Sequence, residues 1–178
     1  MAQITPGTWT LDAAHSEVGF SVRHAGISKV RGTFQTVAGE LQVAEDFAQS
    51  STAVTVDMTS VDTKNADRDG HLKGEDFFDV ENHPEMTFRS TEVRDVDGEE
   101  FVLVGDLTIR GTTRPVELTA ELGGQAVDPF GVTRVGFEAT GEISRKDFGL
   151  TWNAALEAGG VLVGDKVKIE IAAEFVQA

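Results

Sequence analysis

The sequence predicts an all-β protein, an antiparallel barrel that carries one short helical insert. Apolar and polar residues alternate at period two through most of the 178 residues, as they do in strands with one buried face. Turn signals rich in Gly, Pro and Asp separate these runs, which number roughly eight or more. Only residues 65–80 break the rhythm. Because an open sheet of this size would expose its edges, closure into a barrel is expected.

The first half of the chain contains four predicted strands. They are expected over residues 8–12, 17–24, 30–43 and 53–58, where apolar residues recur at every second position. The third of these strands is expected to break near Gly39, since glycine in a strand interior often marks a bend.

The insert over residues 65–80 is expected to hold one or two helical turns. Asn65 is a suitable N-cap, and Asp67 places a negative charge in the first turn, where it favours the helix dipole. Gly74 predicts the end of the helix. The chain is then expected to become extended again before Pro84, because proline disfavours helix in the residue that precedes it.

The second half consists of long predicted strands. The Asp97-Gly98 pair is a hairpin signal. The predicted inward faces mix very large and very small residues, for example Phe137 with Gly141. Small residues can leave a cavity inside a barrel, or large residues from opposite walls can fill the space; the pattern alone leaves both outcomes open. The continuous apolar faces run over residues 101–109, 116–122, 135–143 and 167–175.

Composition narrows the possible partners. The chain carries 30 acidic and 15 basic residues, a formal net charge of −15, which opposes binding to nucleic acid and docking on an anionic membrane. It has no cysteine, which excludes disulfides and thiolate chemistry. No apolar stretch could span a bilayer, so stable membrane insertion is not expected. Residues 1–7 lack the features of a signal peptide, and a cytoplasmic location is expected. Residues 1–178 are expected to form one domain.

No enzyme signature is present. The sequence lacks a phosphate loop, GxGxxG, HExxH and GxSxG, so no catalytic residue, cofactor or metal ligand is predicted. One alternative is a calcium site in residues 65–76, whose Asp, Asn and Gly spacing approaches that of an EF-hand loop, or a zinc site made of scattered histidines. Another alternative is an enzyme that uses paired carboxylates such as Asp69 and Asp76. The four histidines are His15, His24, His71 and His83.

Arg68 and His71 are one helical turn apart, so both can project from one face of the insert. They could form a cationic anchor for a phosphate or another polar head group. Alternatively, Arg68 could pair with a carboxylate and fix the insert to the barrel. Phe77 and Phe78 are similarly open to two interpretations, a core plug or a ligand clamp.

The chain resembles the YceI-like family of lipocalin-like, polyisoprenoid-binding proteins, and the similarity extends over almost the whole sequence. Its motifs include Trp9-Thr10-Leu11-Asp12, Arg68-Asp69 with His71-Leu72, Asp76-Phe77-Phe78-Asp79, Gly105-Asp106-Leu107-Thr108-Ile109-Arg110-Gly111 and Arg145-Lys146-Asp147-Phe148-Gly149.

The resemblance implies an eight-stranded antiparallel barrel with an elongated apolar tunnel. It also implies a non-enzymatic carrier or storage protein that holds a long-chain isoprenoid or a similar amphiphile, such as a polyprenyl phosphate, a quinone precursor or a fatty acid derivative, and that often pairs as a homodimer. Alternation and resemblance together predict the ligand contacts. The wall is expected to use Phe20, Val22, Phe34, Val56, Met58, Phe88, Leu107, Phe137 and Ile169. Phe77, Phe78, Phe148 and Trp152 are expected to line or cap an end, and the polar anchor is expected among His24, Arg68 and His71.

Overall fold

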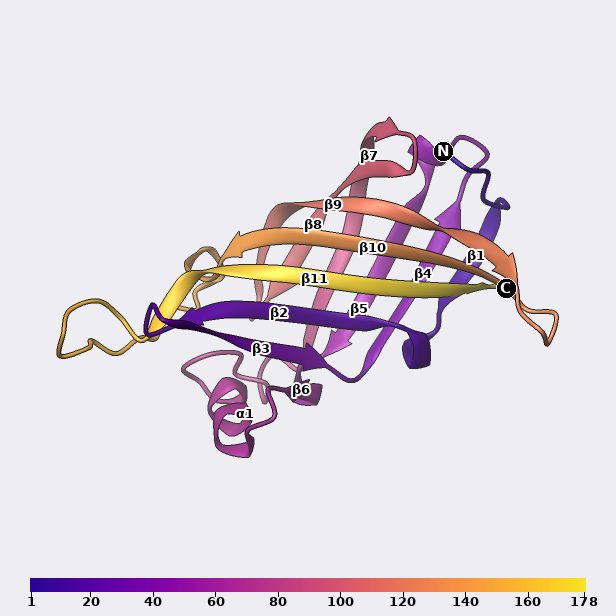
Figure 1. Ribbon diagram of the computed structural model, residues 1–178. Helices are drawn as coiled ribbons and strands as arrows, with labels where there is room; N and C mark the ends of the chain where they lie inside the picture. Colours follow the sequence, from indigo (N-terminus) through magenta and orange to yellow (C-terminus); the bar gives the residue numbers. More distant parts are fainter.

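The computed structural model describes all 178 residues and contains eleven strands in one sheet (Figure 1). The strands of the first half are β1 (Gly7–Leu11), β2 (Glu17–His24), β3 (Ser28–Phe34), β4 (Val37–Val43), β5 (Ser51–Asp57) and β6 (Val61–Asp62). The long strands of the second half are β7 (Glu85–Asp97), β8 (Glu100–Ile109), β9 (Thr112–Val127), β10 (Thr133–Ser144) and β11 (Val163–Gln177). One α-helix, α1 (Ala66–Lys73), and four 3-10 helices complete the fold: η1 (Ala13–His15), η2 (Phe47–Gln49), η3 (Met58–Ser60) and η4 (Arg145–Phe148).

The eleven strands build eight walls. The first wall consists of β1 and β2, which both pair with β11. The second consists of β4, paired with β1, and β3, paired with β2. The third consists of β5, paired with β4, and β6, paired with β3. These three interrupted walls and the five single strands β7 to β11 follow each other in chain order, all antiparallel. Pairing of β1 with β11 closes the ring. The protein is therefore an eight-stranded antiparallel barrel with one short helix, as the sequence predicted.

Strand phase also agrees with the sequence. The predicted inward residues of β8 to β11 are the buried or half-buried ones, as in β8, where Phe101, Leu107 and Ile109 are buried. Gly98, which follows Asp97, has a positive φ of 60° in the β7–β8 hairpin. Such turns favour glycine because it has no Cβ.

One predicted break is wrong. The wall formed by β3 and β4 is interrupted at residues 35–36, and Gly39 lies inside β4 opposite Val54. A Cβ at Gly39 would come within 3.0 Å of the Val54 side chain and 3.1 Å of the Ala53 carbonyl oxygen. Gly39 is therefore explained by a close approach of two strands and not by a bend.

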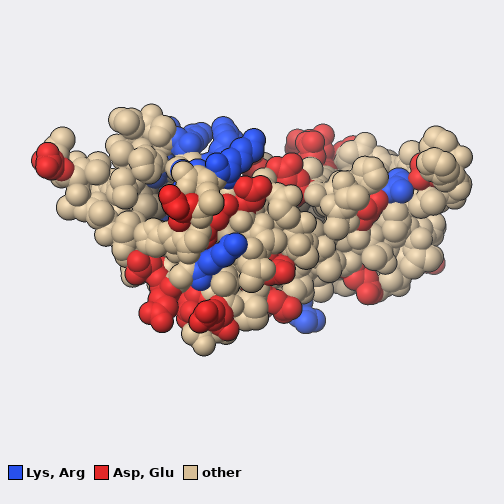
Figure 2. Space-filling view, turned by 90° about the horizontal axis from the view of Figure 1, so that it is seen from below, with Lys and Arg blue, Asp and Glu red and all other residues tan.

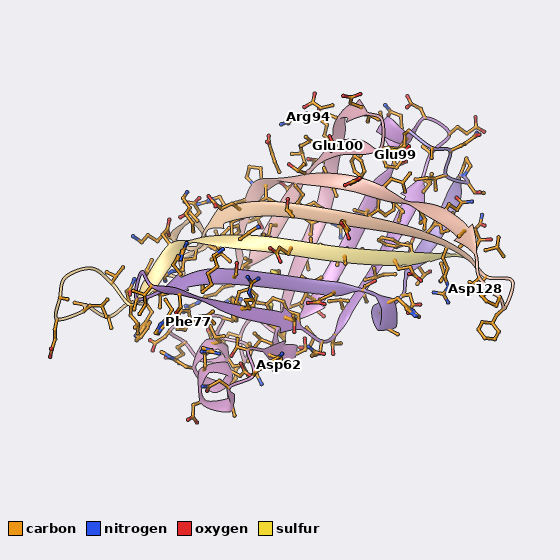
Figure 3. All side chains as sticks on the ribbon, in the orientation of Figure 1. Asp62, Phe77, Arg94, Glu99, Glu100 and Asp128 are labelled. Carbon is orange, nitrogen blue, oxygen red and sulfur yellow. The ribbon has the colours of Figure 1, made fainter.

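The two ends of the barrel differ. One end, beside the chain termini, is packed by a buried cluster made of Ile4, Trp9, Leu41, Val43, Leu122, Val135 and Phe175. At the other end lie the β2–β3 hairpin, the long loop over residues 149–162, and α1 with the segment that follows it (Figure 1). We call this second end the mouth. Figure 3 shows Phe77 at the mouth and Asp128 at the opposite end.

Helix α1 begins and ends as the sequence predicted. The Asn65 side chain accepts a hydrogen bond of 3.0 Å from the Arg68 backbone N–H, and Gly74 is the C-cap. The backbone of Gly74 is extended rather than left-handed, so glycine is not required there by its φ angle. α1 is short and polar, and no helix of the chain has the length and hydropathy needed to cross a membrane.

Candidate ligand-binding cavity

A cavity of about 390 Å³ lies inside the barrel. Of the 46 residues that line it, 36 are hydrophobic, and they come from all eight walls. Ligand pockets of roughly 300–1,000 Å³ are typical for drug-sized ligands. The barrel interior therefore contains an apolar cavity and is not filled completely by its own side chains.

Glycines in the barrel wall allow two aromatic rings to pack against the neighbouring strand. The Phe20 ring lies over Gly32, where a Cβ would come within 2.4 Å of Phe20 Cζ. The Phe88 ring lies over Gly105 in the same way, also at 2.4 Å. Because each ring lies against the wall, it leaves the middle of the barrel open. This answers the question that the alternation of large and small residues left open.

Three aromatic rings gather at the mouth. The ring centroids of His71 and Trp152 are 4.7 Å apart, those of His71 and Phe77 are 5.0 Å apart, and those of Phe77 and Trp152 are 5.4 Å apart. All three residues line the cavity. They come from α1, from the segment after it and from the 149–162 loop, so two separate insertions meet at the entrance.

The charge of the lining is opposite to that of the chain. No Asp or Glu is among the lining residues, although the chain has 30 of them. The lining residues that can carry charge are all basic: Arg23, His24, Arg68, His71 and Arg145. The cavity lining thus combines apolar walls with basic side chains and without carboxylates.

Arg68 is anchored to the chain just before α1. Its Nε donates to Thr63 Oγ1 and its Nη2 donates to the Thr63 carbonyl oxygen, both at 2.8 Å. The Thr63 hydroxyl in turn donates to Asp69 Oδ1. Arg68 makes no ion pair with a carboxylate, so the interpretation that it is neutralised by an acid is wrong.

Arg145 is a mouth residue that the sequence prediction missed. It is 3% exposed and donates to four carbonyl oxygens, those of Leu150, Trp152, Val163 and Gly164, at 2.6–3.2 Å. Burial lowers the pKa of Arg145 and the nearby Asp165 opposes this shift. The sequence could have predicted its inward position, because Arg145 continues the period-two inward face of residues 135–143.

Comparison with known proteins identifies the family. A family model described as YceI-like domain matches residues 9–175. The chain belongs to the YceI-like family. Protein YceI of Escherichia coli O157:H7 is 44% identical over 140 residues, which cover 78% of this chain and 73% of that protein. The similarity predicted from the sequence motifs is thereby confirmed.

Solved structures show the same YceI-like fold. The YCEI protein of Campylobacter jejuni is 32% identical, with a TM-score of 0.73 over 100% of this chain and 99% of that one. A domain from Saccharophagus degradans, described as polyisoprenoid-binding, is 14% identical, with a TM-score of 0.73 over 98% of this chain and 100% of that one. At 14% identity this second likeness shows the fold alone.

Most of the predicted ligand contacts lie on the wall of this YceI-like cavity. The lining includes Phe20, Val22, His24, Phe34, Val56, Arg68, His71, Phe77, Phe78, Phe88, Leu107, Phe137, Trp152 and Ile169. That these residues touch a ligand stays a prediction. Met58 and Phe148 do not line the cavity, and this part of the prediction is wrong. Each lies in a 3-10 helix, where the period of two no longer applies, and each is 2% exposed in a packed cluster with wall residues such as Phe34 and Val56.

The insert does not have the form of a calcium loop. Residues 66–73 are helical, and the Asn65 oxygen caps the helix. Asp69 Oδ1 accepts hydrogen bonds from the Thr63 N–H and hydroxyl groups, and Asp76 lies 2.9 Å from His71 Nε2. Neither carboxylate lines the cavity, so the structure does not support the pair as catalytic groups acting inside it.

Proposed function

We propose that this YceI-like protein binds a long-chain amphiphile, an isoprenoid with an anionic head group such as a polyprenyl phosphate, inside the barrel as a carrier or storage protein. The observation that supports this is the lining: an apolar cavity with no carboxylate and with basic side chains at its mouth. We infer binding rather than catalysis, because no nucleophile with a neighbouring base lines the cavity.

The tail of such a ligand would provide most of the affinity. Burial of one methylene contributes roughly 0.8 kcal/mol, so about twenty of them would contribute on the order of 16 kcal/mol before the cost of ordering the chain and of lost rigid-body freedom. Partial burial of the tail is therefore enough for tight binding. The head group would set the orientation, with an anion near Arg68 and His71.

Native mass spectrometry of the purified protein, followed by organic extraction, tests this proposal. We expect a bound species with the mass of a long-chain amphiphile, or uptake of polyprenyl phosphate by stripped protein with weaker uptake of the neutral polyprenol. Failure of the folded protein to take up any long-chain probe would contradict the proposal. Equal uptake of both probes would contradict the anionic head group alone.

Two variants distinguish the cavity from the surface. Phe137→Asp places a charge on the cavity wall, where desolvation is costly, and should abolish uptake and weaken the fold. Val127→Asp places the same charge on a side chain that is 65% exposed and should leave uptake unchanged. Cell fractionation and light scattering test the cytoplasmic location and the homodimer, both of which stay predictions.

A further inference from the structure

The β2–β3 hairpin carries basic side chains on its outer face. The register places Arg23 opposite Lys29 and Ser21 opposite Arg31, and the adjacent strand β11 adds Lys166 near the same end. We call Arg23, Lys29, Arg31 and Lys166 the basic patch. All four are exposed, and none makes an ion pair with a carboxylate. Figure 2 shows Lys and Arg gathered on this face near the mouth.

Two exposed apolar side chains lie beside this basic patch. Ile27, at the tip of the β2–β3 hairpin, is 84% exposed, and Val161, in the 149–162 loop, is 51% exposed. The two segments are joined directly, since the Ala25 N–H donates to the Leu162 carbonyl oxygen at 2.7 Å. Leu162 lines the cavity. Ile27, Val161 and the basic patch therefore all lie near the entrance.

Because the rest of the chain is acidic, the basic patch would determine how the protein is oriented on an anionic surface. At physiological ionic strength charges act over about 8 Å, so a surface that contacts the β2–β3 side of the mouth meets the basic patch and not the net charge of −15. The other side of the mouth, α1 and the segment after it, carries exposed acidic side chains such as Glu75 and Asp76. An anionic surface would repel most other faces. The expectation from composition alone, that the protein avoids anionic membranes, neglects this separation of charge.

We propose that the β2–β3 side of the mouth docks on an anionic lipid bilayer, with the basic patch against the head groups, with Ile27 and Val161 in the interfacial layer, and with the acidic α1 segment turned away from the bilayer. Basic residues that flank a few apolar side chains are typical of peripheral membrane contacts. A protein partner usually needs about 800 Å² of complementary surface, whereas the apolar part here consists of two side chains, Ile27 and Val161. Docking is peripheral and would let an amphiphile pass between bilayer and cavity; this consequence rests on the proposed function.

Vesicle co-sedimentation of the full chain tests the docking. Vesicles of phosphatidylcholine containing phosphatidylglycerol should retain the protein, and vesicles of phosphatidylcholine alone should not. Lys29→Gln with Arg31→Gln should weaken retention about tenfold or more, and Ile27→Ser should weaken it severalfold. Neither Lys29 nor Arg31 lines the cavity, so uptake of polyprenyl phosphate from detergent solution should not change in that double variant.

Matched controls exist elsewhere on the chain. Arg89→Gln with Arg94→Gln, both on β7, removes the same charge outside the basic patch and away from the mouth (Figure 3), and Phe130→Ser removes an apolar side chain that is 90% exposed in the β9–β10 turn. Both should leave vesicle binding unchanged. The proposal is overturned if the protein does not bind the anionic vesicles, or if the control variants lose as much binding as the basic-patch variant. Absence of binding would instead point to an acidic protein as the partner. Retention on vesicles without uptake of any amphiphile would overturn the proposed function and leave the docking intact.

Discussion

Arg68 and Arg145 both face the cavity, but the chain holds them in different ways. Arg145 gives hydrogen bonds to four carbonyl oxygens and is almost fully buried. Arg68 bonds only to Thr63 through Nε and Nη2 and is half-buried, so its Nη1 group has no partner within the protein. We therefore assign the organisation of the mouth loop to Arg145 and contact with a head group to Arg68.

Arg68→Gln should change which ligand is preferred. It removes the charge and keeps a polar side chain, so affinity for a polyprenyl phosphate should fall about tenfold or more, the value of a charge-assisted hydrogen bond. Affinity for the neutral polyprenol should not change. Titration calorimetry with both ligands measures this. A loss of thermal stability with no change in ligand preference would show that Arg68 only fixes the insert.

Arg145→Met should destabilise the fold. It removes a donor from the carbonyl oxygens of Leu150, Trp152 and Gly164, whereas that of Val163 still accepts from the Asn153 side-chain amide. Breaking such a buried network costs about 3–5 kcal/mol. Urea denaturation measures the free energy of unfolding. Arg145→Lys, which keeps the charge but has fewer donors, should lie between the parent chain and Arg145→Met. An unchanged midpoint in both variants would refute the assignment.

At the scale of elements, the sequence predicts which residues of each strand face inward, but it does not predict where the strands end. Each long strand has one buried face, so a period of two identifies its inward residues. Met58 was misplaced because β5 ends one residue earlier, at Asp57, and Met58 is the first residue of η3. A change from strand to 3-10 helix leaves no mark in the alternation of apolar residues. Arg145, in phase with the β10 face, was missed because the inward face of the residues before it is entirely apolar or glycine, and the polar anchor was sought elsewhere.

Gly32→Ala tests whether the glycine on β3 keeps the Phe20 ring of β2 against the wall. The three atoms nearest to the new methyl group would all belong to the Phe20 ring, and none to the backbone. The ring should swing into the cavity and lower the affinity for a long chain severalfold. Adding Phe20→Leu should restore binding. Gly136→Ala, in β10 with nothing within 4 Å, is the control and should not change affinity. Full affinity in Gly32→Ala would contradict this account of the cavity.

At the scale of the whole molecule, an ionic cluster ties the closed end of the barrel together. Arg134 on β10 lies 2.7 Å from Asp12, 2.8 Å from Asp128 and 2.8 Å from Glu174. These residues come from the link after β1, the β9–β10 turn and β11. Asp12, Glu174 and His15 also lie close enough to one another to suggest a metal site, but Arg134 already binds both carboxylates. Such a cluster is not visible in the sequence because closure of the barrel creates it.

The Arg134 cluster should make stability depend on pH in the acid range. Hydrogen bonds from Arg134 and then from His15 lower the pKa of Asp12 from 3.8 to about 2, and the Arg134 hydrogen bond also lowers the pKa of Asp128. A carboxyl with a lowered pKa in the folded state contributes stability above its unfolded pKa and loses it as the pH falls through the folded value. Urea unfolding should therefore show a decline from about pH 4 to pH 2 that is smaller in Arg134→Gln. Arg94→Gln, which removes an exposed ion pair with Glu117, should follow the parent curve; parallel curves for the parent chain and Arg134→Gln would show that the cluster does not couple folding to protonation.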